Sequence, residues 1–443
     1  MTLDAKTPLK IKEPPPTREN GNGSQDAARL RPFSTPRVTP LDRWLTRKMV
    51  EVVGNPPVCI RLWDGIEASP PCDHPVATLA YHDRGALLAT IVDPELHWGD
   101  LYSNGRVDFE GDMASFLETV YRGIGTKGEG GWLRRLVVGL GYRRNANTPE
   151  KARDNIHHHY DLGNDFYEAW LDRAEMQYTC AYFAHDDMGL EEAQLAKLEH
   201  VCRKLELSPG MTVVEAGCGW GGLARYMARE YGVRVRAYNI STEQVAYARR
   251  RAEEEGLSHL VEYVLDDYRN IDGRYDAFVS VGMLEHVGPD GYRELGAIIR
   301  RCLKPEGRGL IHSIGRQSGK PMNAWIERRI FPGAQPPALG EMMQIFEPNE
   351  LTVLDVENLR LHYSRTLRHW AERYEANAPM IRQKMDEAFY RAWYLYLHGS
   401  IAAFNTGELQ LYQVVFSHRE NNRVPWTRRH LYDPPVARDD GRG

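Results

Sequence analysis

Residues 213–222 read Val-Val-Glu-Ala-Gly-Cys-Gly-Trp-Gly-Gly, and this stretch decides the fold. Two β-branched residues lead into a glycine-rich turn, and the segment LARYMAREYG that follows has the apolar spacing of a helix. Glycine allows a backbone to turn sharply and to approach a ligand closely at a helix N-terminus. The stretch therefore predicts a strand, a ligand-binding loop and a helix in succession.

Short β-rich runs alternate with long helical patterns on both sides of this loop. The runs are TVVEAG (212–217), VRVRAYN (233–239), LVEYVLDD (260–267), AFVSVG (277–282), GLIHSIG (309–315) and LQLYQVVFSH (409–418). Repeated strand–helix–strand order indicates a mostly parallel sheet that is covered on both faces. We therefore predict a doubly wound, Rossmann-like α/β domain over residues 155–420.

A smaller α/β domain is predicted upstream, over residues 41–123. It begins with a helix whose apolar positions are Trp44, Leu45, Met49, Val52 and Val53. Three short strands then follow, VCIRLWDG (58–65), VATLAYHD (76–83) and ALLATIV (86–92). Residues 1–40 are rich in Pro, Gly, Ser and charge and predict a disordered lead-in, and residues 421–443 predict a loose polar tail.

The two predicted domains are joined by a basic linker, residues 124–154. It carries Trp132 close to Arg134, Arg135, Arg143 and Arg144. Two interpretations stay open: a solvated connector, or an amphipathic stretch that contacts anionic lipid.

Composition limits the class of protein. A chain of 443 residues suggests two or three domains at about 150 residues each. The net charge of −5 argues against a general nucleic-acid binder, and no run approaches the ~18 apolar residues of a membrane-spanning helix. The N-terminus lacks the apolar run of a secretory signal, and the six cysteines form no CxxC pair. We therefore expect a cytoplasmic protein.

The glycine loop matches G-x-G-x-x-G through Gly217, Gly219 and Gly222, so a nicotinamide or flavin dinucleotide is one candidate ligand. Two details of the sequence favour a different ligand. Glu215 lies where a carboxylate can reach an amino-acid ammonium group, and the next strand ends in Asn239-Ile240-Ser241 without the acidic residue that holds an NAD ribose. Both suit S-adenosylmethionine. A glycine turn without a ligand is the remaining alternative.

Several motifs in the same order resemble one family. They are HHHYDLGNDFYEAWLD (157–172), MQYTCAYF (176–183), EAGCGWGGLA (215–224), NISTEQ (239–244), DDYRNI (266–271), SVGMLEHVG (280–288), IHSIG (311–315) and IFPG (330–333). Together they resemble the cyclopropane-fatty-acid synthase family of S-adenosylmethionine methyltransferases over residues 155–418. The resemblance implies a class I methyltransferase fold with a helical lid, and residues 41–123 resemble the small N-terminal domain of the phospholipid-acting members.

The resemblance also implies which residues contact the cofactor. They are Tyr178, Thr179, Glu215, Gly217, Gly219, Asn239, Ile240, Gln244, Asp267, Tyr268 and Arg269. The last three match the segment at the adenine. An Asp–Tyr pair after a strand is able to hydrogen-bond to and stack on a purine, although ordinary packing of Tyr268 is an alternative.

The implied reaction methylates the double bond of unsaturated acyl chains in membrane phospholipids. An alkene has no proton to lose beforehand, so the carbocation formed by methylation must lose one afterwards, and the site needs a base. In the resembling family that base is a bound bicarbonate ion. The positions that match its binding residues are Cys180, Glu285 with the neighbouring His286, His312, Ile314 and Tyr363. Any one of them alone would be weak evidence, since a histidine after an apolar strand is often a core residue.

Other functions remain open at this point. A methyl- or methylene-branched product would use the same cofactor and lipid, whereas a lipid-binding module with an inactive site and a dehydrogenase are different classes. We expect no covalent role for Cys180, since no Cys-His-Asn order is visible, and no metal at His157–His159, since adjacent histidines do not converge on one ion. Glu215 stands where relatives more often have Asp, and Ser400 where many have Cys. Peripheral association with the inner face of the cell membrane is expected, and a homodimer is compatible with the resemblance.

Overall fold

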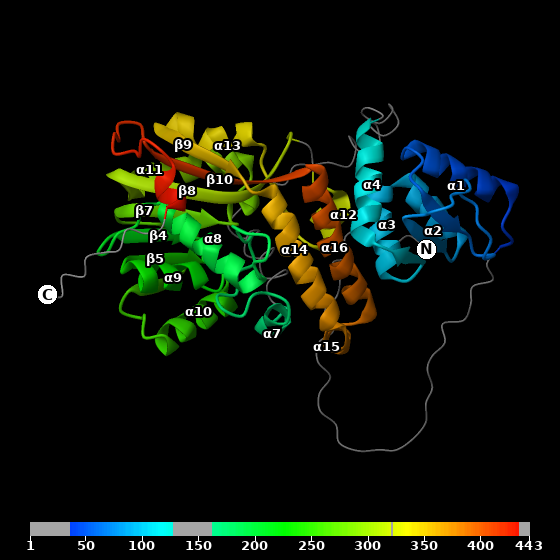
Figure 1. Cartoon of the computed structure of the whole chain (residues 1–443), viewed down its shortest axis with the longest axis horizontal. Helices are drawn as coiled ribbons and strands as arrows, with labels where there is room; N and C mark the ends of the chain where they lie inside the picture. Colours follow the sequence, from blue (N-terminus) through cyan, green and yellow to red (C-terminus); the bar gives the residue numbers. More distant parts are fainter. Residues whose placement is uncertain (1–35, 127–161, 320–321, 434–443) are drawn as a thin grey trace, which may run out of the picture. The chain divides into compact units, whose positions relative to one another are not determined.

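The computed structural model describes residues 36–126, 162–319 and 322–433 (Figure 1). The chain divides into two compact units, which comprise residues 1–142, 323–330 and 375–402, and residues 143–322, 331–374 and 403–443. The sequence-based boundaries assigned residues 323–330 and 375–402 to the larger domain, whereas in the structure they cluster with the smaller unit. Most of the lead-in, the basic linker with Trp132 and its arginines, and the His157–His159 run fall outside the described residues.

The smaller unit is built on a three-stranded sheet, in which β1 pairs with β2 in parallel and β2 with β3 antiparallel. Its elements are α1 (Pro40–Val52), β1 (Val58–Arg61), β2 (Ala77–Tyr81), α2 (Arg84–Val92), α3 (Pro94–Ser103), β3 (Val107–Gly111), α4 (Met113–Thr126), α12 (Ala324–Arg329), α15 (Ala378–Lys384) and most of α16 (Glu387–Thr406).

Two local predictions for this unit are wrong. The run ALLATIV forms helix α2 rather than a strand, because Asp83 caps it by accepting a hydrogen bond from Ala86 N at 2.9 Å. Helix α1 is confirmed, but its buried positions are Asp42, Thr46 and Val50 instead of the predicted apolar set. Asp42 takes that place because it both caps α1 and accepts hydrogen bonds from Arg84 at 2.7 and 2.9 Å.

The larger unit contains the predicted sheet, with seven strands in the order β6-β5-β4-β7-β8-β10-β9. They are β4 (Thr212–Ala216), β5 (Arg234–Asn239), β6 (Val261–Leu265), β7 (Tyr275–Val281), β8 (Leu303–Arg316), β9 (Leu351–Asn358) and β10 (Leu409–His418). The pairs from β6 to β8 are parallel, and β10 runs antiparallel to both β8 and β9. The mostly parallel α/β fold is therefore confirmed, and β9 is a strand that the sequence pattern did not predict.

Helices cover both faces of this sheet (Figure 1). α8 (Leu190–Lys204), α9 (Gly222–Tyr231) and α10 (Thr242–Glu254) pack on one face, and α11 (Tyr292–Cys302) and α13 (Leu339–Phe346) on the other. The core alternates along each strand, so that Val213 belongs to the first cluster and Val214 to the second. Three further α-helices of the described part of this unit are α7 (Asn164–Glu168), α14 (Arg360–Ala376) and α17 (Arg429–Tyr432).

Residues 421–433 pack against the rest of the larger unit, so the prediction of a loose tail is wrong for this segment. Leu431 on α17 is buried, and the guanidinium of Arg203 on α8 donates to the Asp433 carbonyl at 2.6 Å. Among the described helices, none is long and apolar enough to cross a membrane.

Candidate active site

The predicted site residues gather at one edge of the larger sheet. Glu215 is the penultimate residue of β4, Asn239 ends β5, Asp267 follows β6, Glu285 follows β7, and His312 and Ile314 lie near the end of β8. Ligands of open α/β sheets bind outside the carboxyl ends of the parallel strands, and this is that edge. Two more segments complete the set: Tyr178–Cys180 precedes α8, and Tyr363 lies on α14.

The glycine loop leaves an open hollow at the N-terminus of α9. Gly219 has a φ of +52°, and a Cβ added there would meet no atom within 4 Å. Gly217 has a φ of +84°, and a Cβ there would lie 2.9 Å from the Met283 Cβ. Backbone amides of Gly217 and Cys218 donate to the Tyr238 carbonyl at 2.9 and 3.1 Å, which anchors the loop to β5. A ligand can therefore approach the backbone closely at Gly219.

Two amide side chains fasten this loop. Asn239 Nδ2 donates to the Gly219 carbonyl at 3.1 Å and to Gln244 Oε1 at 2.9 Å, and its Oδ1 accepts from Ser241 N at 3.0 Å. Asn239 and Gln244 are both buried, and Ile240 between them is half-buried. The predicted contacts Asn239, Ile240 and Gln244 thus lie beside the loop, where the two amides fix its shape.

Glu215 is buried, and one oxygen of its carboxyl group is unpaired. Its Oε2 has no hydrogen-bond partner among the described residues. Burial raises the pKa of Glu215 to about 8, although Lys197 and Arg225 lower it in part. A buried and unpaired carboxylate is costly, so the position suits the ammonium group of an amino-acid-bearing ligand. This observation shows that the residues present fit S-adenosylmethionine.

Lys197 is the main residue of this region that the sequence analysis missed. It is fully buried on α8, and its Nζ donates to Gln177 Oε1 at 2.5 Å and to Thr179 Oγ1 at 2.9 Å. Burial lowers the pKa of Lys197 to about 8. Gln194, from the same helix, donates to the Thr179 carbonyl at 2.8 Å. A lysine within the apolar stretch LAKLEHV was the available signal, because lysine is rarely fully buried without a partner.

Aromatic rings line the segment that carries Tyr178. Its ring centroid lies 5.2 Å from that of Trp170 and 5.4 Å from that of Trp370. Tyr363 continues the cluster, with centroid distances of 5.9 Å to Trp370 and 4.7 Å to Phe404. Ring faces of this kind stabilise a nearby cation by about 1–2 kcal/mol.

The three residues predicted at the adenine interact with one another. Asp267 accepts from Arg269 N at 2.9 Å and pairs with the Arg269 guanidinium at 2.9 Å. That guanidinium lies 4.8 Å from the centroid of the Tyr268 ring. The Tyr268 hydroxyl is buried and has no partner among the described residues. A purine stacked on Tyr268 would therefore have to lie on the ring face opposite this guanidinium.

Glu285 and His312 each keep one buried polar atom unpaired. Glu285 Oε1 accepts from Ile314 N at 2.6 Å, and Nδ1 of His312 contacts Gln413 Nε2 at 3.1 Å. Glu285 Oε2 and His312 Nε2 have no partner among the described residues. Buried polar atoms are almost always hydrogen-bonded, so these two atoms are able to bind a small polar ligand. We call Glu285 and His312 the oxyanion cage.

The charge states of the cage follow from burial. It raises the pKa of Glu285 to about 7 and lowers that of His312 well below its ordinary value, with further lowering by Lys197 and Lys204. His312 is thus neutral at physiological pH. The neighbouring His286 is also neutral, since burial lowers its pKa to about 4.

The other predicted cage residues take different roles. Ile314 contributes its N–H to Glu285, so this amide orients the carboxylate and is not available to an anion. Burial raises the pKa of the Cys180 thiol, which stays protonated and directs its Sγ to the Ala181 carbonyl at 3.2 Å. A protonated thiol is a poor nucleophile, in agreement with the expectation of no covalent role.

The raised pKa of Glu285 gives a prediction about stability. Folding favours the protonated carboxyl, so its contribution is full below the ordinary pKa of 4.5 and is lost as the pH rises through about 7. Glu285→Gln should therefore make the anion-free protein more stable than the wild type at pH 8, by up to about 3 kcal/mol, with little difference at pH 4.5. Denaturant unfolding at both pH values measures this, and an equal difference at both would contradict it.

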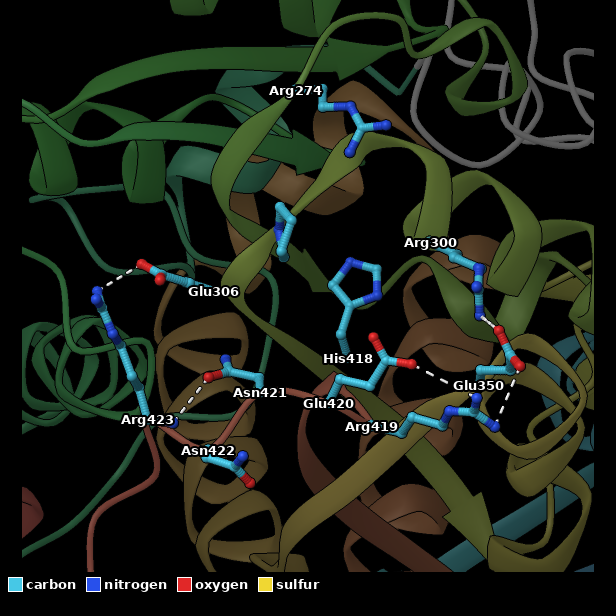
Figure 2. Close-up of a pocket in the computed structure, with 11 residues that line it drawn as sticks. Arg274, Arg300, Glu306, Glu350, His418, Arg419, Glu420, Asn421, Asn422 and Arg423 are labelled. Atoms are coloured by element: carbon cyan, nitrogen blue, oxygen red, sulfur yellow. Dashed lines mark hydrogen bonds and ion pairs between the residues drawn. The ribbon is translucent and has the colours of Figure 1, made fainter.

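A separate cavity of about 530 Å³ lies at the opposite edge of the sheet, where β8 and β9 begin and β10 ends. Figure 2 shows ion pairs between arginines and glutamates of its lining: Arg423 pairs with Glu306 at 2.5 Å, Arg419 with Glu350 at 3.2 Å, and Arg300 also with Glu350. None of the predicted site residues lines it. Among the described residues there is also no cluster of His, Cys, Asp and Glu that could hold a metal ion.

The fold, the glycine loop and the unpaired Glu215 together define a class I S-adenosylmethionine-dependent methyltransferase. The family model for mycolic acid cyclopropane synthetase matches residues 147–414. The chain belongs to this family.

Named relatives agree with this assignment. A probable fatty acid methyltransferase of Pseudomonas putida is 33% identical over 395 residues, which is 85% of this chain and 96% of the relative. A cyclopropane-fatty-acyl-phospholipid synthase of Escherichia coli is 44% identical over 265 residues, 60% of this chain and 68% of the relative. The crystal structure of mycolic acid cyclopropane synthase CmaA1 complexed with SAH and CTAB has a TM-score of 0.57 and 30% identity, and covers 60% of this chain and 97% of that one.

Proposed function

We propose that this methyltransferase acts on the double bond of unsaturated acyl chains in membrane phospholipids and forms cyclopropane fatty acids, with bicarbonate as the base. The observation that carries the proposal is the oxyanion cage, in which Glu285 Oε2 and His312 Nε2 are buried without partners among the described residues. The relatives support the substrate class, because those with named products act on fatty acyl lipids.

The carboxyl edge of the sheet would hold S-adenosylmethionine, which supplies the methyl group. Glu215 would pair with the ammonium group, Gly219 would allow close approach, and Tyr268 would stack on the adenine. Lys197 would support this site in two ways. It donates a hydrogen bond to Thr179, and its charge lowers the pKa of Glu215. These groups hold and orient the cofactor, which lowers the entropic cost of reaching the reactive geometry.

The oxyanion cage would hold bicarbonate, which supplies the base. Glu285, when ionised, accepts hydrogen bonds only and would take the O–H of the ion, while neutral His312 would donate to one of its oxygens. Tyr363 on α14 would close this side of the site, and its aromatic neighbours Trp370 and Phe404 exclude water and tolerate a passing cation. No protein side chain then needs to be the base itself.

The most specific part of the proposal is the identity of the product. A methyl- or methylene-branched chain would arise with the same cofactor and lipid if the proton were lost from another carbon. The cage favours the cyclopropane, because an ordered base held at one place removes a proton from one place. A lipid-binding module with an inactive site would have no reason to keep two buried polar atoms unpaired.

The test is incubation with methyl-labelled S-adenosylmethionine and vesicles of unsaturated phospholipid, with and without bicarbonate. We expect labelled cyclopropane protons in the NMR spectrum of the lipid, and a rate that rises with bicarbonate. Label in a branched methyl or exocyclic methylene group would establish the alternative product. Vesicle binding without any label transfer would contradict the proposal.

The proposal includes a cytoplasmic enzyme that associates peripherally with the inner face of the cell membrane, with a homodimer as a further possibility to test. Exposed apolar side chains of the smaller unit support the membrane contact. Leu41, Trp44 and Val52 of α1 are 61%, 52% and 73% exposed. They are apolar side chains on the outer side of an amphipathic helix, whose inner positions are already buried. Basic side chains on the same helix would add attraction to anionic lipid.

We therefore predict that the double variant Leu41→Ser/Trp44→Ser binds anionic vesicles about tenfold more weakly, since it loses two apolar anchors. Sedimentation with vesicles at low and high salt measures the effect, and high salt should weaken the wild type as well. Val424→Ser, which changes an exposed apolar residue of the larger unit, is the matched control. Unchanged binding of the double variant would remove α1 from the membrane contact.

A further inference from the structure

Three polar side chains occupy directly paired positions on neighbouring strands. Gln413 on β10 is paired with His312 on β8 and with Glu357 on β9. Side chains of directly opposite residues lie on the same face of a sheet and interact. The three therefore form one row across the sheet, which ends at the oxyanion cage.

His312 and Gln413 of this row are buried and Glu357 is half-buried, and their contacts are specific. Gln413 is fully buried, and its Nε2 lies 3.1 Å from Nδ1 of His312. At the other end, Glu357 Oε2 accepts from His200 Nε2 at 2.8 Å and from Lys204 Nζ at 2.5 Å. These partners hold Glu357 ionised, with a pKa lowered to about 2. A fixed charge thus lies at the position paired with Gln413 on β9, and the amide of Gln413 lies between it and His312 in the register.

The contact at Nδ1 determines where the proton of His312 resides. With Gln413 Nε2 facing the ring, Nδ1 accepts a hydrogen bond and carries no hydrogen, while Gln413 Oε1 has no partner among the described residues. The charged groups that face His312 are Lys197 and Lys204, which oppose protonation, and Glu357, which favours it; together with burial they leave the ring neutral. A neutral imidazole without hydrogen on Nδ1 carries it on Nε2, the atom that is unpaired in the cage.

We propose that Gln413 is a positioning residue of the reaction, which holds His312 in the Nε2–H tautomer so that it presents a donor to an anion in the cage. This inference rests on the proposed function. With the opposite tautomer, the lone pair of Nε2 would face the anion and repel it. Glutamine suits this task because it does not titrate, whereas an ionised carboxylate at the same place would accept a hydrogen bond from Nδ1–H and favour the opposite tautomer or the charged ring.

The first test is spectroscopic and requires no turnover. In ¹⁵N-labelled full-length protein at pH 8, we expect the His312 ring to show an unprotonated Nδ1 and a protonated Nε2, with the signals identified by their loss in His312→Asn. A protonated Nδ1 with an unprotonated Nε2 would overturn the proposal. This result requires no variant of Gln413, so it remains decisive even if such a variant fails to fold.

The second test uses Gln413→Met, which removes the donor at similar volume, and Gln413→Glu, which reverses the hydrogen bond. We expect Gln413→Met to populate both tautomers, to lower turnover about ten- to a hundredfold and to raise the KM for bicarbonate, as is typical when a partner that orients a histidine is lost. Gln413→Glu should place hydrogen on Nδ1 and reduce turnover further. The affinity for S-adenosylmethionine should stay within twofold in both.

Gln410→Met is the matched control, because Gln410 is a buried glutamine of the same strand that bonds to Gly407 and Asn358. It should leave the His312 signals unchanged. If Gln413→Met leaves both the tautomer and the bicarbonate KM unchanged, the proposal is wrong. If the tautomer is as expected and turnover of the wild type is independent of bicarbonate, the proposed base fails while the role of Gln413 in fixing the tautomer stands.

Discussion

Glu285→Gln is expected to lower turnover by about a hundred- to a thousandfold, the usual cost of removing one preorganised group that stabilises the reacting species. The neutral amide keeps the size of the side chain and can still accept from Ile314 N, so the local backbone should hold. It loses the charge that receives the O–H of bicarbonate. The KM for bicarbonate should therefore rise together with the loss of turnover.

The affinity for S-adenosylmethionine separates a role in the cage from general damage. No hydrogen bond joins Glu285 to Glu215 or to the glycine loop among the described residues, so calorimetric titration should give a Kd within twofold of the wild type. Glu347→Gln, which alters an exposed glutamate, is the matched control and should change neither quantity. Equal losses of cofactor affinity and turnover in Glu285→Gln would move this residue out of the cage.

Glu215→Gln is expected to raise the Kd for S-adenosylmethionine by about ten- to a hundredfold, because a hydrogen bond to a charged partner contributes about 1.5–3 kcal/mol. Glu215→Asp keeps the charge on a shorter side chain and should retain most of the affinity. This pair of variants separates the charge of the residue from its size.

The pH dependence of binding gives a second readout for Glu215. Its pKa of about 8 means that the carboxyl of the free protein is mostly protonated at pH 7, and it must lose this proton to pair with an ammonium group. Affinity of the wild type should therefore increase between pH 6.5 and 8.5, with release of a proton on binding, whereas Glu215→Gln should show no such increase. Parallel pH profiles would show that Glu215 is not the group that titrates.

The sequence predicted the larger fold well because its strands are buried on both faces. Runs such as TVVEAG and AFVSVG are continuous and apolar, which leaves a covered parallel strand as the main interpretation. The failures arose where one local signal outweighed another. In ALLATIV the β-branched residues indicated a strand, but the cap at Asp83 starts a helix. In α1 the ion pair between Asp42 and Arg84 takes the inner face in place of the predicted apolar residues.

The same contrast applies to the site. Glu215, Glu285 and His312 lie in motifs whose order along the chain could be recognised. Lys197 and Gln413 lie in a helix and a strand with no motif, and their roles depend on tertiary packing and on the register of β10 against β8. Ile314 also lies in such a motif, but the hydrogen bond from its N–H to Glu285 is a contact that only the fold could reveal.

The most direct measurement is a crystal structure with S-adenosylhomocysteine and bicarbonate. The account predicts a planar anion within hydrogen-bond distance of Glu285 Oε2 and His312 Nε2. A cage filled by protein side chains, or empty at saturating bicarbonate while the nucleoside is bound, would contradict it.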